Sequence, residues 1–516
     1  MDATANPAAP ALDEFRRLRR ESALTPADAE RLARQAAALF KDYYVNQSAY
    51  LDDAITLLAE LATHPDPALA RVGTAHLFPE LVEWSADWFN PDYCRLYDRL
   101  FAQVIEICRG LPQDRELNFT LHGYGIANMG DMLARRERLR APRPPFDPAA
   151  ERVQKIVVLS RVTFGAEVAV TSVILRGVAQ RYPEAERVLL GAPVVAQLFA
   201  GEPGLRVQDA RYPRGGSLLD RLSSWPALTQ IVADELAGLD SNQFLIIDPD
   251  SRLTQLGLLP LTSDESRYLF FESRSYGSDA ETEAAQGARI SQLTARWLDE
   301  QFRPAQAEEG GEATLPFVNL AVEHQALTRA LREALNDGRP LVGVSFGVGG
   351  NEAKRVGTDF EADLLRALCA AGARVLLVKG VGAEVARAEQ HLDSLRRQGL
   401  HVHATKADWP RALPGASQLR RADVIGWEGE LGAFCAVIAA ADVYVGYDSG
   451  GSHIAAAQGV PVVDVFADDS IPMVTTRWTP TGPAPVHVVA HYEAPTETLD
   501  RVMAAYHACV AGAPQP

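Results

Sequence analysis

The stretch VGYDSGGSHIAAAQGVPVVDVF, residues 445–466, carries the clearest information on the fold. It begins as an apolar run typical of a buried strand and continues as an alanine-rich segment typical of a helix, which Gly459 can end. The β-branched run VPVVDVF then predicts the next strand. A strand, a helix and a strand in this order indicate a parallel sheet of the Rossmann-like type.

Small and polar residues stand between the first strand and the helix of this stretch: Asp448, Ser449, Gly450, Gly451 and His453. They are expected at the carboxyl end of the strand, where the first N–H groups of the helix lack partners and its dipole is positive. Glycines let a ligand approach such a loop, Ser449 and Ser452 add hydroxyls, and His453 can donate to an oxyanion. These features predict an anion site. The alternative is that Asp448 and Ser449 only cap a buried helix and His453 packs on its side.

A second loop, in LVGVSFGVGGNEAKR at residues 341–355, also follows a predicted strand. It contains Gly347, Gly349, Gly350, Lys354 and Arg355. Glycines and basic groups suit a diphosphate, whereas Lys354 and Arg355 alone would also fit a solvated helix start. Together the two loops predict a site for a nucleotide-linked diphosphate.

Three changes in composition divide the chain. Helical patterns fill the first part, and alternating strand and helix patterns follow a proline-rich stretch; short runs such as KIVVLS, QFLIIDPD and ADVYVGYD predict the strands. The expected organisation is an all-α domain at 1–140, a proline-rich linker at 141–152, a Rossmann-like domain at 153–322 with a polar insertion at about 272–315, a second Rossmann-like domain at 323–490, and a C-terminal helix and tail at 491–516. Two such domains leave a cleft between the carboxyl ends of their sheets.

The composition excludes several classes of protein. A formal net charge of −17 argues against a nucleic-acid partner. No apolar run reaches the roughly 20 residues of a transmembrane helix, and the start of the sequence lacks a signal-peptide pattern. We therefore expect a cytoplasmic protein, either free or peripheral at the inner membrane. The five cysteines show no metal-ligand spacing, so no metal site is predicted.

The two loops resemble the donor half of bacterial glycosyltransferase family 9, the ADP-heptose:lipopolysaccharide heptosyltransferase-like enzymes of GT-B fold. The family pattern there is aspartate, serine or threonine, glycine, two variable residues and histidine, followed by an alanine-rich helix and a G-x-P turn. In this chain the pattern is met by Asp448, Ser449, Gly450, His453, Gly459 and Pro461. The stretch KIVVLSRVTFGAEVAVTSVILRGVAQRYP resembles the opening of the family's acceptor half. The likeness covers about 153–490, without the helical region.

The resemblance implies an α/β fold of GT-B type, with two Rossmann-like domains facing across a cleft after the all-α domain. Residues 153–322 would bind the acceptor and residues 323–490 the nucleotide-sugar donor. The implied reaction is a metal-independent, inverting transfer of a heptose-like sugar from a nucleotide-diphospho-sugar to an acceptor hydroxyl, without a cofactor. The acceptor would be a saccharide, a lipid-linked glycan or a protein. The resemblance does not extend to the α-domain, and its pattern leaves three roles open: binding a protein acceptor, forming an oligomer contact, or packing against the cleft.

The resemblance also implies roles for single residues. The family usually has Gly-Asp in its first loop, with that aspartate proposed as the base, whereas this chain has Gly165-Ala166-Glu167 in a loop one residue longer. Glu167 is therefore the candidate base, and its alternative is an acid stabilised by a helix dipole. The leaving diphosphate would be neutralised by Lys354, Arg355, the backbone from Ser449 to Gly451, and His453. Asp448 would orient the loop or bind a sugar hydroxyl.

Two other functions stay open at this point. One is a catalytically silent protein that binds a nucleotide-sugar or acts as a scaffold on the same fold. The replacement of the family's Gly-Asp by Gly165-Ala166-Glu167 keeps this alternative open. The other is a sugar-nucleotide epimerase, another enzyme with tandem Rossmann-like domains. Turnover of the donor without an acceptor would distinguish an epimerase from a transferase.

Overall fold

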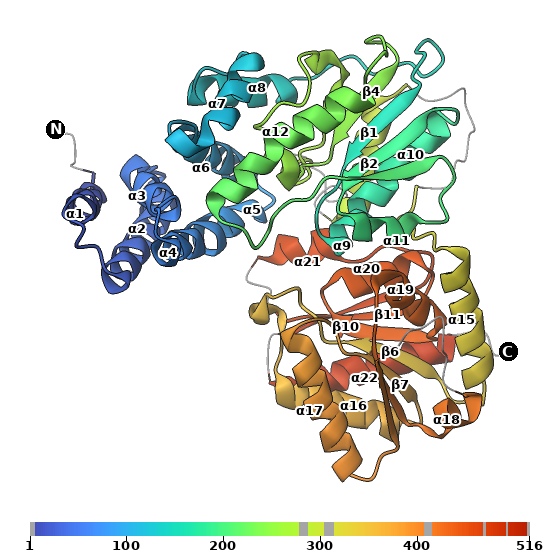
Figure 1. Cartoon of the computed structure of the whole chain (residues 1–516). Helices are drawn as coiled ribbons and strands as arrows, with labels where there is room; N and C mark the ends of the chain where they lie inside the picture. Colours follow the sequence, from blue (N-terminus) through green and yellow to red (C-terminus); the bar gives the residue numbers. More distant parts are fainter. Residues whose placement is uncertain are drawn as a thin grey trace. The chain divides into compact units, whose positions relative to one another are not determined.

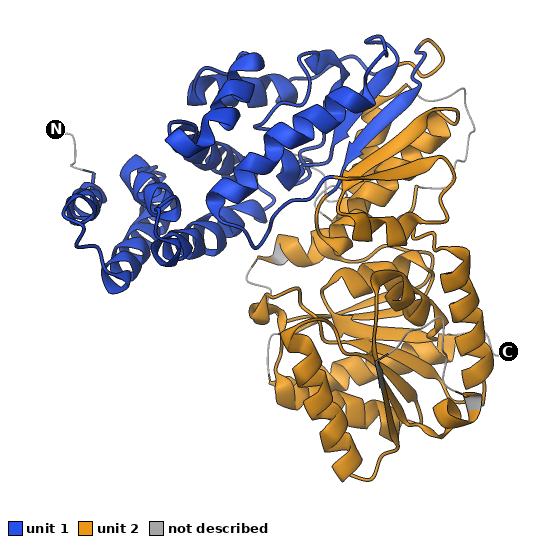
Figure 2. Ribbon diagram, in the orientation of Figure 1, with its two compact units in different colours: residues 1–145, 151–160, 210–281 blue, residues 146–150, 161–209, 282–516 orange. Residues whose placement is uncertain are grey.

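The computed structural model describes residues 6–277, 287–303, 314–406, 415–467, 471–491 and 494–512. Parts of the predicted polar insertion at 272–315, and the end of the C-terminal tail, lie outside these residues. The chain folds into two compact units, shown in Figure 2. Unit 1 comprises residues 1–145, 151–160 and 210–281, and unit 2 comprises residues 146–150, 161–209 and 282–516.

The first 140 residues of unit 1 contain helices and no strand among those that the structure describes (Figure 1). The local sequence explains where several of them begin: Thr25 and Asp28 form a capping box at the start of the second helix, with Pro26 in its first turn. The helices are α1 (Ala9–Arg20), α2 (Pro26–Gln47), α3 (Asp52–Ala62), α4 (Pro67–Leu77), the π-helix η1 (Phe78–Glu83), α5 (Trp84–Ala86), α6 (Pro91–Arg109), the 3₁₀-helix η2 (Pro112–Asp114), α7 (Arg115–Gly123) and α8 (Met129–Arg140).

Charged side chains join these helices to the strand region of the same unit. That region contains β1 (Lys155–Leu159), α12 (Leu218–Glu235), β4 (Phe244–Asp248), η5 (Arg252–Thr254), η6 (Glu265–Arg267) and β5 (Tyr268–Phe270). Arg136 and Arg140 of α8 pair with Asp98 of α6 and with Glu272, which follows β5. Burial favours the neutral form of Glu272, but the two guanidinium groups outweigh it and lower its pKa to about 2. The helical region is thus ionically fixed to the end of β5.

Unit 2 begins with a smaller α/β segment that supplies part of the candidate site. Its elements are α9 (Phe164–Ala166), the π-helix η3 (Glu167–Thr171), α10 (Ser172–Arg181), β2 (Glu186–Gly191), η4 (Pro193–Val195), α11 (Ala196–Phe199) and β3 (Leu205–Asp209). Helix α14 (Ile290–Gln301) packs against α10 in the same unit. This helix forms within the predicted polar insertion.

The rest of unit 2 is built on a seven-stranded sheet whose paired strands are all parallel. Its strands are β6 (Leu341–Ser345), β7 (Arg374–Val378), β8 (Val402–Lys406), β9 (Val424–Glu428), β10 (Val443–Tyr447), β11 (Val462–Phe466) and β12 (Val486–Ala490). The connecting and flanking helices are α15 (Val322–Leu335), η7 (Glu352–Lys354), α16 (Thr358–Ala370), α17 (Ala383–Arg397), α18 (Ala416–Arg421), α19 (Leu431–Ala440), α20 (Gly450–Ala457), α21 (Pro472–Trp478) and α22 (Pro495–Gly512).

The strand orders confirm the predicted fold class. The first sheet has the order β3-β2-β1-β4-β5 and the second the order β12-β11-β10-β6-β7-β9-β8. The fold is therefore α/β, with two parallel Rossmann-like sheets after an all-helical N-terminal region. In the second sheet the chain leaves β6 towards β7 and later returns to β10 on the other side of β6. This reversal is the position at which open α/β sheets bind ligands.

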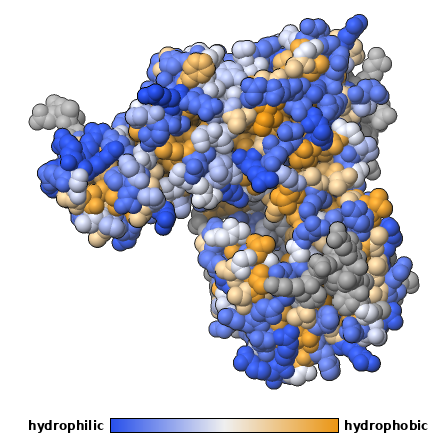
Figure 3. Space-filling model, viewed as in Figure 1, coloured by the Kyte–Doolittle hydropathy of each residue, from blue (hydrophilic) through white to orange (hydrophobic). Residues whose placement is uncertain are grey.

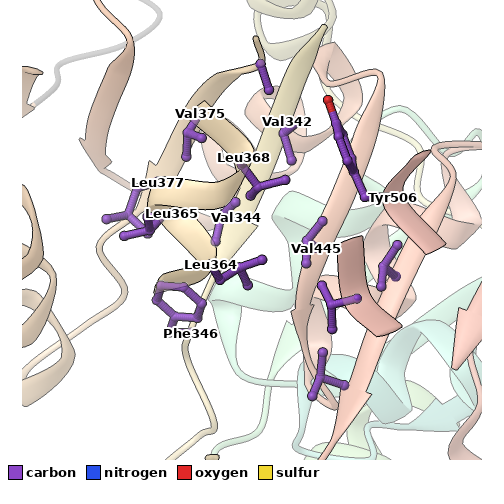
Figure 4. Packing of buried hydrophobic residues seen from close by; sticks show 14 of the residues in the cluster. Val342, Val344, Phe346, Leu364, Leu365, Leu368, Val375, Leu377, Val445 and Tyr506 are labelled. Atoms are coloured by element: carbon purple, nitrogen blue, oxygen red, sulfur yellow. The ribbon is translucent and has the colours of Figure 1, made fainter. Parts of the chain in front are cut away.

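One apolar core lies against the seven-stranded sheet. Figure 4 shows side chains of β6, β7 and β10 packed with those of α16 and α22. Val463 and Val465 of β11 belong to this core. Because side chains alternate along a strand, the residue between them, Asp464, faces the opposite side of the sheet.

The surface of the molecule fits its composition. In the described residues no helix is long and apolar enough to cross a membrane. On the face seen in Figure 3, hydrophilic residues predominate and hydrophobic residues lie in small groups among them. All five cysteines are free thiols.

Candidate functional site

The first predicted loop follows β6 and presents open backbone. Gly349 and Gly350 have φ values of 62° and 88°, in the left-handed region that favours glycine. A Cβ added at either position would meet no further heavy atom within 4 Å. The Asn351 side chain accepts the N–H of Ala353 at 3.1 Å and starts the short helix η7, which ends at Lys354. Lys354 thus stands directly after an uncovered stretch of main chain.

The second loop follows β10 and leads into α20. Ser449 precedes the first residue of this helix, and its hydroxyl makes no capping hydrogen bond. The alternative in which Ser449 only caps a buried helix therefore finds no support in the geometry. Gly451 has a steric reason to be glycine, because a Cβ there would lie 2.1 Å from the Tyr444 Oη. Gly450 is similarly tight, with an added Cβ 3.1 Å from the Cβ of Phe164.

The two loops meet at the reversal point of the sheet. Strands β6 and β10 pair in parallel, so their carboxyl ends lie at the same edge. There the Nζ of Lys354 forms an ion pair with the Oδ2 of Asp448. The Asp448 side chain is 8% exposed and that of Lys354 is 34% exposed. The structure therefore brings together the basic residue of one loop and the acidic residue of the other.

His453 lies on α20 and is almost completely buried. Burial lowers the pKa of its imidazole to about 4; the Asp448 charge opposes this shift and the Lys354 charge adds to it. The ring meets Trp478 edge to face, with 6.0 Å between the ring centroids. At neutral pH His453 is thus an uncharged hydrogen-bonding group in this structure, rather than a cation.

The segment that begins the smaller α/β part of unit 2 packs against α20. Helix α9 and the π-helix η3 both contact α20. A Cβ added to Gly165 would lie 3.1 Å from the Cδ2 of His453. The structure therefore places the Gly165-Ala166-Glu167 stretch beside the loop of Asp448 to Gly451.

Glu167 itself is fully buried at the start of η3. Its Oε1 accepts the N–H of Val162 at 2.8 Å. Val162 is β-branched and has a φ of 71°, a strained conformation for such a residue. The carboxylate thus holds a strained turn of its own loop in addition to any part it takes in chemistry.

The sequence predicts Arg355 at the leaving diphosphate, whereas in the structure its guanidinium group is held by carboxylates. Its Nε and Nη2 donate to the Oε1 of Glu361 at 2.8 and 2.6 Å, and its Nη1 donates to Glu352 at 2.9 Å. Glu361 is fully buried, and its Oε2 lies 2.9 Å from the Nε2 of His391. Arg355 therefore fixes the first loop to α16.

Two further residues, Glu384 and Asp464, belong to the candidate site although no sequence motif singled them out. Glu384 of α17 accepts the N–H groups of Val348 and Val381 at 3.2 and 3.1 Å, and so ties the first loop to the turn after β7. Ser452 of α20 contacts Asp464 of β11. The carboxylate within the apolar run VPVVDVF is visible in the sequence, whereas its contact with Ser452 depends on the fold.

In the part of the chain that the structure describes, no group of three or more histidine, cysteine or acidic side chains is arranged to hold a metal ion.

Several solved structures are similar to this chain. A glycosyl transferase family 9 protein from Veillonella parvula is 14% identical, with a TM-score of 0.48, and the match covers 71% of this chain and 100% of that one. The E. coli heptosyltransferase WaaC with ADP is 14% identical, with a TM-score of 0.44 and coverages of 69% and 99%. The E. coli ADP-heptose LPS heptosyltransferase II is 15% identical, with a TM-score of 0.40 and coverages of 69% and 99%. Comparison with curated protein sequences gives no match.

A comparison with protein-family models is more specific about one region. Residues 411–507 match the model of Glycosyltransferase family 9 (heptosyltransferase). This range includes α20 and the loop from Asp448 to Gly451, and it excludes Lys354 and Glu167. The C-terminal region of this chain is therefore a glycosyltransferase family 9 (heptosyltransferase) domain.

Proposed function

We propose that the chain is a metal-independent, inverting glycosyltransferase that transfers a heptose-like sugar from a nucleotide-diphospho-sugar to an acceptor hydroxyl. One observation carries the proposal: the Lys354–Asp448 ion pair joins two glycine-containing loops at the reversal point of the sheet. One of these loops lies within the family 9 match. Such an arrangement suits a diphosphate, because it combines a cation with main-chain N–H groups.

The donor diphosphate would bind between the two loops. An ammonium group has three N–H donors, so Lys354 can hold Asp448 and a phosphate oxygen at the same time. The first N–H groups of α20, from Gly450 onwards, lie within an eight-residue helix and point towards its N-terminal side. Gly347, Gly349 and Gly350 would keep the first loop close to the phosphates, and Ser449 would add a hydroxyl.

The transfer step follows from the inverting reaction. The acceptor oxygen attacks the anomeric carbon while the bond from that carbon to the diphosphate oxygen breaks on the opposite face. The acceptor proton passes to a carboxylate, and the negative charge develops on the leaving diphosphate. Lys354, the N–H groups of the second loop and His453 would stabilise that charge. Because His453 is neutral in the free protein, it would act by donating a hydrogen bond.

Glu167 is our candidate for the general base. In its favour, its segment packs against α20 next to His453. Its complete burial sets a condition, because an acceptor hydroxyl reaches the carboxylate only after the residues that cover it have moved. Arg355 is assigned a supporting part, since its contacts with Glu361 keep the donor loop in place.

The burial of Glu167 also favours a second candidate function. In a nucleotide-sugar-binding protein without transferase activity, the donor loops would stay intact and Glu167 would only hold the Val162 turn. The two functions differ in turnover and agree in donor binding.

Two measurements test these candidates. Thermal unfolding with ADP-, GDP- and UDP-sugars identifies the donor, because a ligand that binds the folded state raises the melting temperature. Release of the nucleoside diphosphate is then measured with that donor, with and without saccharide, lipid-linked glycan and protein acceptors. Acceptor-dependent release supports the transferase; binding without release supports the binding protein. Release of the diphosphate without any acceptor would contradict both candidates and favour an epimerase or a hydrolase. A melting temperature that does not change with any of the donors would contradict the nucleotide site itself.

A further inference from the structure

A buried carboxylic acid lies beneath the second donor loop. Asp464 occupies the middle of β11 and is fully buried on the side of the sheet opposite the main apolar core. Its Oδ1 lies 2.7 Å from the Oγ of Ser452, in the first turn of α20. Among the described residues its Oδ2 has no hydrogen-bond partner, and no lysine, arginine or histidine there forms an ion pair with it. An ionised carboxylate in such a place is very unfavourable.

The hydrogen bonds around Ser452 have a simple solution if Asp464 is protonated. The Ser452 Oγ lies 3.2 Å from the carbonyl oxygen of Tyr447 as well as close to Asp464. A hydroxyl has one proton to donate. A protonated Asp464 donates to Ser452, which in turn donates to the Tyr447 carbonyl, and both contacts are satisfied. An ionised Asp464 would instead accept the hydrogen bond from the single O–H of Ser452. The Tyr447 carbonyl would then receive no hydrogen bond from Ser452.

The charged and titratable groups around Asp464 point the same way. Asp448 is the like charge and Lys354 the cation that act on it, and the charge of Asp464 in turn acts on Tyr444 of β10. His453 on α20 feels the same two charges of Asp448 and Lys354. Burial raises the pKa of Asp464 well above its usual range and the Asp448 charge adds to this, whereas Ser452 and Lys354 oppose it. A second negative charge here would also repel an incoming diphosphate.

We propose that Asp464 is a positioning residue, whose neutral carboxyl holds Ser452 and thereby the first turn of α20 in the geometry that receives the donor diphosphate. The inference rests on the proposed donor site, and it assigns a task to a residue that touches no substrate. The relay runs from Asp464 on β11 through Ser452 on α20 to the end of β10. It therefore fixes the loop of Asp448 to Gly451 from below.

The first test measures ADP affinity by calorimetry at pH 7. Asp464→Asn keeps the shape and can donate to Ser452, so its affinity should stay within about twofold of the parent, whereas Asp464→Ala should bind about tenfold more weakly. Ser452→Ala breaks the same relay. The double variant Asp464→Ala/Ser452→Ala should therefore lose no more ADP affinity than either of its two single variants. Equal losses in Asp464→Asn and Asp464→Ala would mean that the charged form acts, and no loss in either would mean that the relay has no positioning role; both results overturn the proposal.

The second test needs no ligand and separates this proposal from the donor site itself. A folded protein that keeps the Asp464 proton, while the unfolded chain releases it above about pH 4, becomes less stable as pH rises. Urea unfolding of the parent and of Asp464→Asn is compared between pH 4.5 and 7.5. As pH rises, the unfolding constant of the parent should increase relative to that of the variant by up to about tenfold per pH unit. Parallel pH profiles of the two proteins would overturn the neutral carboxyl even if ADP binds. If the parent shows this relative loss of stability but does not bind ADP, the donor site is wrong, and with it the positioning role, although Asp464 is neutral.

Discussion

Lys354 and Asp448 are 94 residues apart in the sequence, and their side chains form the ion pair that connects the two proposed donor loops. The pair leaves Lys354 partly exposed and Asp448 nearly buried. In the donor site that we propose, the cation is therefore already held in place before any ligand binds.

The first prediction concerns Lys354→Ala. Loss of a charge-assisted hydrogen bond to a phosphate should weaken the binding of a nucleoside diphosphate by about ten- to a hundredfold. The free energy of unfolding should fall by only about 1 kcal/mol, because the lysine side chain is partly solvated. Calorimetry with ADP and urea unfolding measure the two effects.

A matched control is Lys155→Ala, which removes another lysine–carboxylate contact, at 3.1 Å from Glu235 in unit 1. It should leave ADP affinity unchanged. If the parent and Lys354→Ala bind ADP with equal affinity, Lys354 is a solvated surface residue and not a phosphate ligand.

The second prediction concerns the steric limit at Gly451. Gly451→Ala would place a Cβ 2.1 Å from the Tyr444 Oη, so the start of α20 must shift. The cost of such overpacking is about 1–3 kcal/mol of stability, and donor affinity should fall with it. Removing the hydroxyl with Tyr444→Phe should restore part of both in the double variant. No rescue by Tyr444→Phe would show that the glycine is needed for another reason.

The third prediction separates two roles of Glu167. Glu167→Gln keeps an oxygen that can accept the Val162 N–H, but it cannot take a proton from the acceptor. If Glu167 is the base, this variant should bind the donor like the parent and lose about a hundred- to ten-thousandfold in turnover. Glu167→Ala should in addition lose about 1–3 kcal/mol of stability, because the Val162 N–H loses its partner. Turnover at the parental rate in Glu167→Gln would place the base elsewhere.

Much of the fold was predictable because its signals are local. A strand buried on both faces needs a continuous apolar run, so KIVVLS, QFLIIDPD and ADVYVGYD give β1, β4 and β10. The carboxyl ends of parallel strands meet at one edge, which is why the loops of Lys354 and Asp448 could be expected to lie close together.

Other features depend on contacts that no local pattern reports. The pairing of Lys354 with Asp448, and of Arg355 with buried Glu361, requires the folded backbone. A glycine at 451 looked like an open approach for a ligand, whereas its neighbour Tyr444 supplies a packing reason. The association of the helical region with the strands of unit 1 depends on buried charges, such as Arg136 with Glu272, that are 136 residues apart.

The fourth prediction tests whether Arg355 binds phosphate or holds the loop. Arg355→Met leaves Glu361 fully buried without its cation and should cost about 3–5 kcal/mol of stability. The double variant with Glu361→Met should regain much of this stability. If Arg355 only supports the loop, donor affinity should recover with it. An affinity that stays low in a stable double variant would instead indicate a direct contact between Arg355 and the donor.

The fifth prediction follows from the environment of His453. Its pKa is about 4 in the folded protein and close to 6.5 in an unfolded chain. Between these values the unfolded state binds more protons, so the stability that is fully present above pH 6.5 is lost as pH falls towards 4, by about 3 kcal/mol for this group. His453→Gln cannot titrate and should lack this loss. Urea unfolding of both proteins is measured at several pH values from 7.5 to 4.5. As the solution becomes more acidic, the free energy of unfolding of the parent should decrease relative to that of the variant. Identical pH profiles would mean that the imidazole is not held in its neutral form, and that it can meet the leaving diphosphate as a cation.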